Sequence, residues 1–349
     1  MRIRVDLTIG LMVAASAAQA VTPCDRLVAY ARGLPPTVWA MGDKALAPAL
    51  VFGEDRPDNS KADVATAFER RLAARPEVHE TLAVDDEGSI QVDRLAGTDI
   101  YALTSVQGTM HCYTSMFLRA RPGAEPSTVA APRSLAGDDN EICWTTVEGV
   151  ARAFDTPVHV VHDLLVPTAT TATFTITPWR GAVWGPACRA VLTFRAAYTL
   201  DDHYCGDQAV CAAGSKVASD VAAAYHRLRE SNDQANSFAF GPPPPPEFAA
   251  RIAAVKLTQA ASDFPTFGAA AGREPGYGGS GHIVFPLQLD GHWYAAAVGE
   301  GGVGWREDET TLLAVFNLDG KTLTPLAGFV VRRSLAGLDS AKTTPLDGG

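Results

Sequence analysis

The sequence predicts an α+β protein dominated by antiparallel β-sheet, with about four helices and stabilising disulfides. Apolar and polar residues alternate over much of residues 89–205, a pattern typical of half-buried strands. Two Asp-Gly pairs, Asp290-Gly291 and Asp319-Gly320, each lie between apolar runs and indicate tight β-hairpins. Six cysteines in a chain that begins with an export signal favour disulfide bonds over free thiols.

The export signal comprises residues 1–20, MRIRVDLTIGLMVAASAAQA. A short Arg-bearing start, an apolar run and small residues at the end are the layout of a cleavable secretory signal. We therefore expect cleavage between Ala20 and Val21 and a periplasmic or secreted mature protein. A lipid anchor would need a cysteine directly after the cleavage box, whereas Val21-Thr22-Pro23 separates Cys24 from it. No later segment reaches the roughly 18–20 apolar residues of a membrane span, so we expect no membrane insertion.

The cysteines lie at widely spaced positions, and an even number predicts three disulfides. Their positions are Cys24, Cys112, Cys143, Cys188, Cys205 and Cys211. Spacing does not choose among the possible pairings, with one exception. Cys205 and Cys211 flank the short polar loop of CGDQAVC, so we expect this pair to close locally. A bonded sulfur has no thiolate, which argues against a cysteine nucleophile.

Four helices are expected, over about residues 23–32, 61–75, 216–230 and 247–259. In the first, Thr22 can cap the helix, Pro23 suits the first turn and Gly33 can end it. Cys24 then faces the core, where a disulfide would pin the helix to the rest of the fold.

The second helix has Ser60 and Asp63 as its capping pair and Pro76 as its stop. The stretch between the first two helices contains Trp39 and GEDRPDNS, and its composition predicts an irregular, exposed loop. Five consecutive prolines in GPPPPPEF predict a stiff polyproline II spacer.

Strands are expected between these helical regions. Residues 110–121 alternate, and Gln107-Gly108 indicates a tight hairpin to the apolar run before them. Residues 171–177 and 190–195 alternate in the same way, so the region forms a mainly antiparallel sheet.

We expect two folded blocks separated by a Pro-rich and Gly-rich connector. The predicted organisation is a signal peptide at 1–20, a helix-plus-β domain at 21–231, a connector with one helix at 232–280, a β-hairpin block at 281–335 and a disordered tail at 336–349. Alternatively, the two blocks complete one shared sheet assembly.

The net charge of −10, with no basic run, makes nucleic acid or an anionic membrane surface an unfavourable partner. Common catalytic motifs are absent: Ser280 lacks the flanking glycine of a hydrolase elbow, and there is no HExxH, GxxxxGK, CxxC or SxxK. The acidic clusters lack the alternating ligand spacing of a calcium loop. We therefore assign no catalytic residue, metal ligand or cofactor.

The stretch PVHVVHD places His159, His162 and Asp163 within five positions. On a helix the three side chains would share one face and could bind a metal. On a strand His162 would point away from the other two. The valine content and the alternating neighbours favour the strand, and with it ordinary strand histidines.

Tryptophan and arginine are paired twice. PWRGAVW contains Trp179, Arg180 and Trp184, and GWRED contains Trp305 and Arg306. Aromatic faces beside guanidinium donors suit contacts with a protein or a cell-envelope saccharide, so these five residues are the candidate binding residues. The alternative is that the tryptophans close the ends of a small core.

These observations favour a non-enzymatic exported protein that binds another macromolecule, such as an inhibitor, a protective partner or an envelope interaction protein. The alternative is a periplasmic hydrolase whose site is assembled in three dimensions from dispersed residues. The candidate residues of that alternative site are His111, His203, His292, Asp202 and Asp163.

Overall fold

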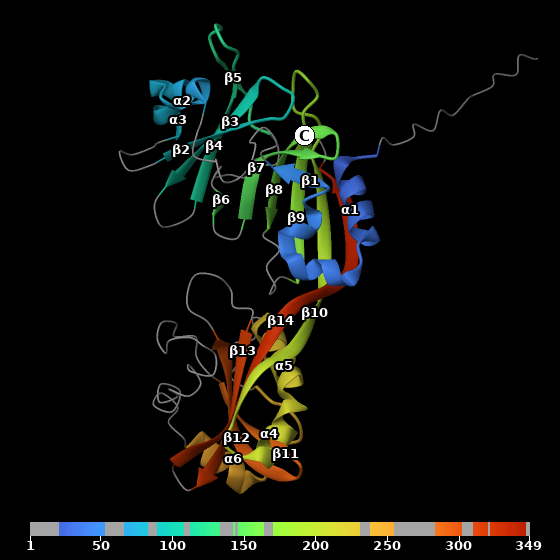
Figure 1. The fold of residues 1–349 in the computed structure, drawn as a ribbon, viewed down its shortest axis with the longest axis vertical. Helices are drawn as coiled ribbons and strands as arrows, with labels where there is room; N and C mark the ends of the chain where they lie inside the picture. The colour runs from blue at the N-terminus through green and yellow to red at the C-terminus, as the bar shows by residue number, and fades with distance from the viewer. Residues whose placement is uncertain are drawn as a thin grey trace, which may run out of the picture.

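The computed structural model consists of two antiparallel sheets and the helices that cover them (Figure 1). It describes residues 21–52, 66–82, 89–107, 112–132, 142–143, 146–163, 170–230, 238–254, 283–301, 310–319 and 322–346. The larger sheet has nine strands in the order β1-β7-β8-β9-β10-β14-β13-β12-β11. The smaller has five, in the order β2-β3-β4-β5, with β6 also pairing with β4.

The strands are β1 (Leu50–Phe52), β2 (Ser89–Arg94), β3 (Ile100–Gln107), β4 (Cys112–Arg119), β5 (Ser127–Val129), β6 (Ile142–Cys143), β7 (Thr146–Ala153), β8 (Thr156–Asp163), β9 (Thr171–Pro178), β10 (Cys188–Cys205), β11 (Ile283–Leu289), β12 (His292–Gly301), β13 (Thr310–Asp319) and β14 (Thr322–Pro345). The helices are α1 (Pro23–Gly33), the 3-10 helix η1 (Pro36–Leu46), α2 (Ala67–Ala73), α3 (Pro76–Leu82), α4 (Gln208–Ser215), α5 (Ala218–Glu230) and α6 (Pro246–Ala253).

Two long strands, β10 and β14, join an upper and a lower half of the molecule (Figure 1). They pair from Cys188 opposite Pro345 to Cys205 opposite Ala327. We call upper half the described residues up to 195 together with 335–346, and lower half residues 196–334. The nine-stranded sheet therefore runs through both of the blocks that the sequence suggests.

The end of β14 corrects one expectation. Residues 336–345, expected to be part of a disordered tail, pair with the first residues of β10. Their composition lacks a strong apolar alternation, but the main chain of a central strand supplies hydrogen-bond partners along their whole length. Ala341 is buried against the upper core, which orders the segment further.

The upper core lies between the sheet and the first helices. α1 begins with the capping box of Thr22 and Asp25 and buries Cys24, as expected. Cys24 forms a disulfide with Cys188 at the start of β10, so the bond does pin the helix to the sheet.

Trp39 corrects a second expectation, because it is not in an exposed loop. It lies in η1 and is 1% exposed, with its ring 4.9 Å from the ring of Phe194. The 3-10 helix places Trp39 in an inward-facing set of apolar side chains that also includes Ala45 and Leu46. Gly42, at φ 58°, permits the kink inside η1.

Helices pack on one face of the smaller sheet, and the larger sheet packs on its other face. α2 and α3 cover Leu103 and Leu118. α2 begins after a capping box of Thr66 and Glu69, whereas Ser60 and Asp63 lie outside the described residues. Pro76, expected as a helix stop, is the first residue of α3, because proline suits a first turn as well as it ends a preceding helix.

The lower half covers both faces of its part of the sheet with helices. α4 and α5 pack on one face around Phe329, and Phe248 of α6 packs on the other. The proline run precedes α6: Pro245 has the extended φ −55°, ψ 141°, and Pro246 opens the helix.

Both Asp-Gly hairpins are present. Leu289 pairs with His292, and Asp290 and Gly291 between them have φ of 45° and 85°, as a two-residue primed turn requires. Asp319 pairs with Thr322, although Gly320 lies outside the described residues.

The described residues contain seven helical segments, where about four were expected. The three that the sequence analysis missed are η1, α3 and α4, each no longer than 11 residues. Such short segments carry too few turns to show a 3.6-residue apolar period clearly.

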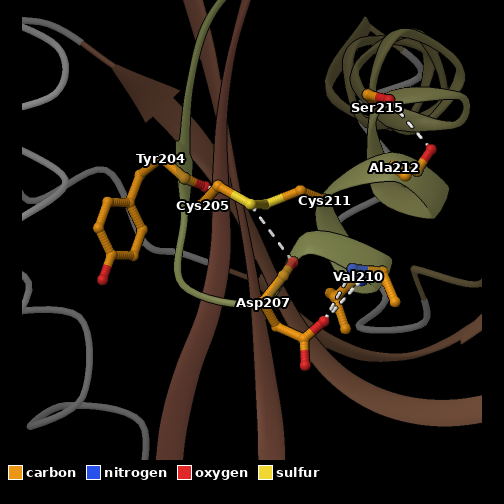
Figure 2. Close-up of a disulfide and its surroundings, with 8 residues drawn as sticks. Tyr204, Cys205, Asp207, Val210, Cys211, Ala212 and Ser215 are labelled. Atoms are coloured by element: carbon orange, nitrogen blue, oxygen red, sulfur yellow. Dashed lines mark hydrogen bonds between the residues drawn. A yellow bond between two sulfur atoms is a disulfide. The ribbon is translucent and has the colours of Figure 1, made fainter.

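The expected Cys205–Cys211 disulfide is confirmed. It joins the end of β10 to α4, whose N-terminus Asp207 caps by accepting from the N–H groups of Ala209 and Val210 (Figure 2). Cys112 and Cys143 lie opposite each other in the β4–β6 register, at a backbone spacing that a disulfide can bridge. The third disulfide therefore stays a prediction with a favourable register.

Candidate functional site

The two stretches that the sequence analysis singled out separately, PVHVVHD and PWRGAVW, meet between the two sheets. PVHVVHD is strand β8, which confirms the strand interpretation. His162 and His159 point to opposite faces of it, as a strand requires. The metal hypothesis, which depended on a helix, is wrong, and no group of three or more His, Cys, Asp or Glu in the described residues could hold an ion.

His162 and Asp163 have structural roles. The His162 ring stacks on Phe174, with centroids 5.0 Å apart, on the face of the upper core. Its Nδ1 lies 2.9 Å from the main-chain oxygen of Asp163, and the Asp163 carboxylate accepts the N–H of Thr173 at 2.8 Å. These contacts hold the end of β8 against the start of β9.

His159 faces the smaller sheet and belongs to a buried polar chain. Its side chain is fully buried, and Nε2–H donates to Oε1 of Glu148 at 2.8 Å. Oε2 of Glu148 accepts the hydroxyl of Ser115 at 3.0 Å, and Thr104 Oγ1 lies 2.9 Å from Ser115 Oγ. Since Ser115 gives its proton to Glu148, Thr104 is the donor to Ser115. The chain thus crosses from β8 and β7 of the larger sheet to β4 and β3 of the smaller.

The order of groups in this chain determines what it can do. In a Ser-His-acid triad the histidine contacts the serine and takes its proton. Here Glu148 lies between Ser115 and His159, so the histidine has no serine proton to accept. A carboxylate whose side chain is 3% exposed needs hydrogen-bond donors, and these two supply them. The chain therefore fixes how the two sheets dock.

Sequence reasoning missed Glu148. The available signal was a charged residue in TVEGVARA on the same strand face as Val150, which is 3% exposed. An acid at an inward position of a strand indicates a buried partner.

The tryptophans of PWRGAVW close this inter-sheet core. Trp179 and Trp184 form an isolated β-bridge, with ring centroids 4.9 Å apart at 73°. Trp179 is 6% exposed. Trp184 is half-buried: its ring lies 5.5 Å from Phe117 and 6.2 Å from His159, and its Nε1–H donates to the Ala130 carbonyl at 2.8 Å. The interpretation that these rings close a core fits better than the interpretation that they offer binding faces.

The bridge holds a short projecting loop, residues 180–183, between the two tryptophans. The N–H of Arg180 donates to the Val183 carbonyl at 3.0 Å, and Gly181 has φ 84°. The Arg180 side chain runs over Gly185, where an added Cβ would lie 2.9 Å from its Nε. Val183, the last residue of the loop, is 64% exposed.

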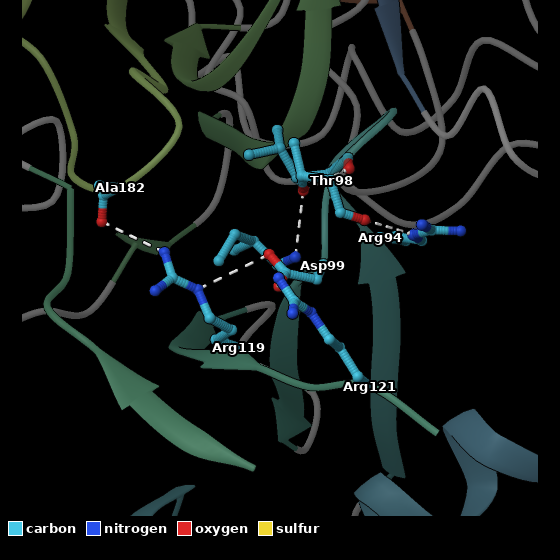
Figure 3. A network of polar contacts seen from close by, with 8 residues as sticks. Arg94, Thr98, Asp99, Arg119, Arg121 and Ala182 are labelled. Atoms are coloured by element: carbon cyan, nitrogen blue, oxygen red, sulfur yellow. Dashed lines mark hydrogen bonds and ion pairs between the residues drawn. The ribbon is translucent and has the colours of Figure 1, made fainter. Parts of the chain in front are cut away.

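Arginines of the smaller sheet support this loop (Figure 3). Arg119 donates from Nη2 to the Ala182 carbonyl at 3.3 Å, and its guanidinium lies 5.7 Å from the Trp179 ring centroid. Asp99 accepts from Arg121 at 2.7 Å and lies 3.6 Å from Arg119. We call the group of Arg119, Arg121, Arg180 and Val183, of which the last three are exposed, the Arg/Val surface. Trp305 and Arg306, the second predicted pair, lie outside the described residues.

The dispersed residues of the hydrolase alternative are not brought together where the structure describes them. Asp163 binds the N–H of Thr173, which pairs with Val191; Asp202 lies about 36 Å further along β10, at about 3.3 Å per residue. His203 pairs with Phe329, and His292 is at the far hairpin of the sheet edge. His111 lies outside the described residues.

A third buried histidine, His226 of α5, lies in the lower half. Burial and the nearby charges of Arg333 and Arg229 lower the pKa of His226 to about 4. The neutral ring accepts from Nη1 of Arg333 at Nδ1 (3.3 Å) and donates from Nε2 to Oγ1 of Thr311 (2.9 Å). These contacts attach α5 to β13 and β14.

An open groove of about 510 Å³ lies between the end of α1 and the end of β14. Its cationic lining residue, Arg32, donates to the Ala341 carbonyl at 2.6 Å and so holds β14 against α1. The groove is therefore the space left where β14 packs against α1.

No family model, no curated protein and no solved structure matches this chain. Among the described helices none is long and apolar enough to cross a membrane.

Proposed function

We propose that this protein is exported and acts by binding another macromolecule, a protein or a cell-envelope saccharide, with the Arg/Val surface as the contact. The observation that carries the proposal is Val183, a large apolar side chain that is 64% exposed in a loop held by several contacts. Arg180 lies beside it in the loop, and Arg119 donates to the loop carbonyl of Ala182. Arginine is enriched in protein interfaces, and an exposed apolar side chain beside it gains free energy when a partner buries it.

The conformation of the loop at residues 180–183 is restrained in the unbound protein. The Trp179–Trp184 bridge, the Arg119 bond and the contact of Arg180 with Gly185 restrict its conformations. Binding then costs little loop entropy, which is how a small contact area yields useful affinity.

Two disulfides among the described residues support the export part of the proposal, because such bonds persist in oxidising compartments. N-terminal sequencing of the mature protein tests it. We expect the first residue to be Val21, and a mature chain that begins at Met1 would refute export by this signal.

The binding part is tested by site-specific photo-crosslinking in the native compartment. A benzoylphenylalanine at position 183 should give a discrete crosslinked band, because this side chain lies within the contact. The matched control places the same group at Met41, which is 55% exposed and belongs to η1. Equal bands at both positions, or none at position 183, would contradict the proposal.

The hydrolase alternative finds no support in the described residues, because its dispersed groups lie apart and the buried Ser115–Glu148–His159 chain has the wrong order.

A further inference from the structure

We infer that the partner of the Arg/Val surface is a protein that presents an acidic segment with an apolar side chain. This inference rests on the proposed function and names the chemistry of the occupant. The inference follows from the local charge, from the hydrogen-bond donors of the arginines and from the exposed apolar side chain of Val183.

The local charge is opposite to that of the whole chain. The chain carries a net charge of −10, yet the Arg/Val surface has three guanidinium groups against one described carboxylate, that of Asp99. The nearby Glu125 is paired with Arg75, which it shares with Glu77. A cationic patch of this kind attracts acidic surfaces.

The three arginines differ in how many of their hydrogen-bond donors remain for a partner. Arg119 is occupied by Asp99, the Ala182 carbonyl and the Trp179 ring, so it acts mainly as a brace. Arg121 contacts Asp99 but its side chain is 72% exposed. Arg180 is exposed and pairs with no carboxylate among the described residues. Arg180 and Arg121 therefore have donors left for carboxylates, which guanidinium groups bind in a bidentate manner.

The exposed apolar side chain of Val183 distinguishes a protein partner from a saccharide. Saccharide sites use aromatic ring faces, and here Trp179 is buried and Trp184 is half-buried and bonded to Ala130. What the loop exposes instead is the aliphatic Val183, which gains by burial against an apolar side chain. Charge and apolar contact together fit a segment in which Asp or Glu residues flank a Leu, Ile, Val or Phe.

Selection from a random-peptide library on the mature protein tests the inference. We expect the selected peptides to combine clustered Asp or Glu with an apolar residue. Their affinity should fall at least about tenfold in the Arg180→Glu/Val183→Asp variant and on raising the ionic strength to about 0.5 M. The matched control, Arg189→Glu/Met41→Asp, changes an exposed arginine and an exposed apolar residue elsewhere and should leave affinity unchanged.

The outcomes separate this inference from the proposed function. Peptides that depend on the Arg/Val surface but carry no acidic bias would overturn the inference and leave the binding function standing. Retention on a heparin column that is lost in Arg180→Glu/Val183→Asp, without acidic peptides, would assign the surface to anionic saccharides and also overturn it. Identical selections by the wild type and by Arg180→Glu/Val183→Asp would overturn both.

Discussion

The upper and lower halves share two strands, β10 and β14, but cover them differently. In the upper half, helices cover one face of the sheet and a second sheet covers the other. In the lower half both faces are covered by helices. The sheet-on-sheet contact produces a rim where loops of two sheets converge, and the Arg/Val surface lies there. The lower half has no such rim among its described residues.

The cross-links of the two halves differ as well. Cys24–Cys188 joins residues 164 apart in sequence, whereas Cys205–Cys211 joins residues only 6 apart. The first restrains the unfolded chain over a long loop and the second acts locally. The largest expected effects therefore concern the upper half.

Removal of each disulfide measures this difference directly. By loop-closure entropy, Cys24→Ala/Cys188→Ala should lower the free energy of unfolding by about 5 kcal/mol, and Cys205→Ala/Cys211→Ala by about 2 kcal/mol. Urea denaturation of both double variants checks the order. Equal losses would show that the long loop is already restrained in the unfolded state.

The buried polar chain of the upper half gives the next effect. Glu148→Ala leaves His159 and Ser115 without their shared acceptor and should cost about 3–5 kcal/mol. Ser115→Ala removes one of the two donors to Glu148 and should cost about 1 kcal/mol. Chemical denaturation compares the two, and a loss below about 1 kcal/mol for Glu148→Ala would contradict the docking role of the chain.

The lower half should contribute the pH dependence. His226 has a pKa of about 4 when folded and about 6.5 when unfolded, so only the unfolded chain gains this proton between those values. The contribution of His226 to the free energy of unfolding is complete above pH 6.5 and is lost as the pH decreases to about 4. The loss amounts to roughly 2–3 kcal/mol after allowance for solvent screening.

Thermal unfolding at a series of pH values tests this loss. His226→Gln should remove the slope between pH 6.5 and 4, while His203→Gln, at an exposed position, should retain it. A slope that survives in His226→Gln would assign the pH dependence to other groups.

The smallest expected effect is at the proposed contact itself. Val183→Ser should change the free energy of unfolding by less than about 0.5 kcal/mol, because an exposed side chain loses little on truncation. Its binding should nevertheless weaken. A stability loss above about 1 kcal/mol would indicate that Val183 belongs to the core of its own chain.

Local patterns in the sequence predicted those parts of the fold that local interactions determine. The Thr22 cap, the Cys205–Cys211 pair, the Asp290-Gly291 turn and the strand character of PVHVVHD each depend on residues close in sequence. The end of β14 and the burial of Trp39 depend on partners more than 100 residues away, which no local pattern shows.

The candidate site was predictable only in part. PWRGAVW was noted for its tryptophans, yet the structure uses these rings as core caps and exposes Arg180 and Val183. Arg119 and Arg121 join the loop only because β4 of the second sheet ends beside it. The role of Glu148 is seen only in its hydrogen bonds with His159 of β8 and Ser115 of β4.

The pairing of α1 with the end of β14 determines where a pull on the chain would act. The Thr343 hydroxyl donates to Oδ1 of Asp25 at 2.7 Å, and Arg32 holds Ala341, so the first and last described elements are side by side in the upper half (Figure 1). Asp25 contacts Thr343 and Arg32 contacts Ala341, so α1 and β14 run antiparallel, and tension between the two chain ends would peel this seam apart from the Asp25–Thr343 contact. The lower half, which is reached only through the paired strands β10 and β14, would lie outside the shortest path of force and keep its fold while the seam resists.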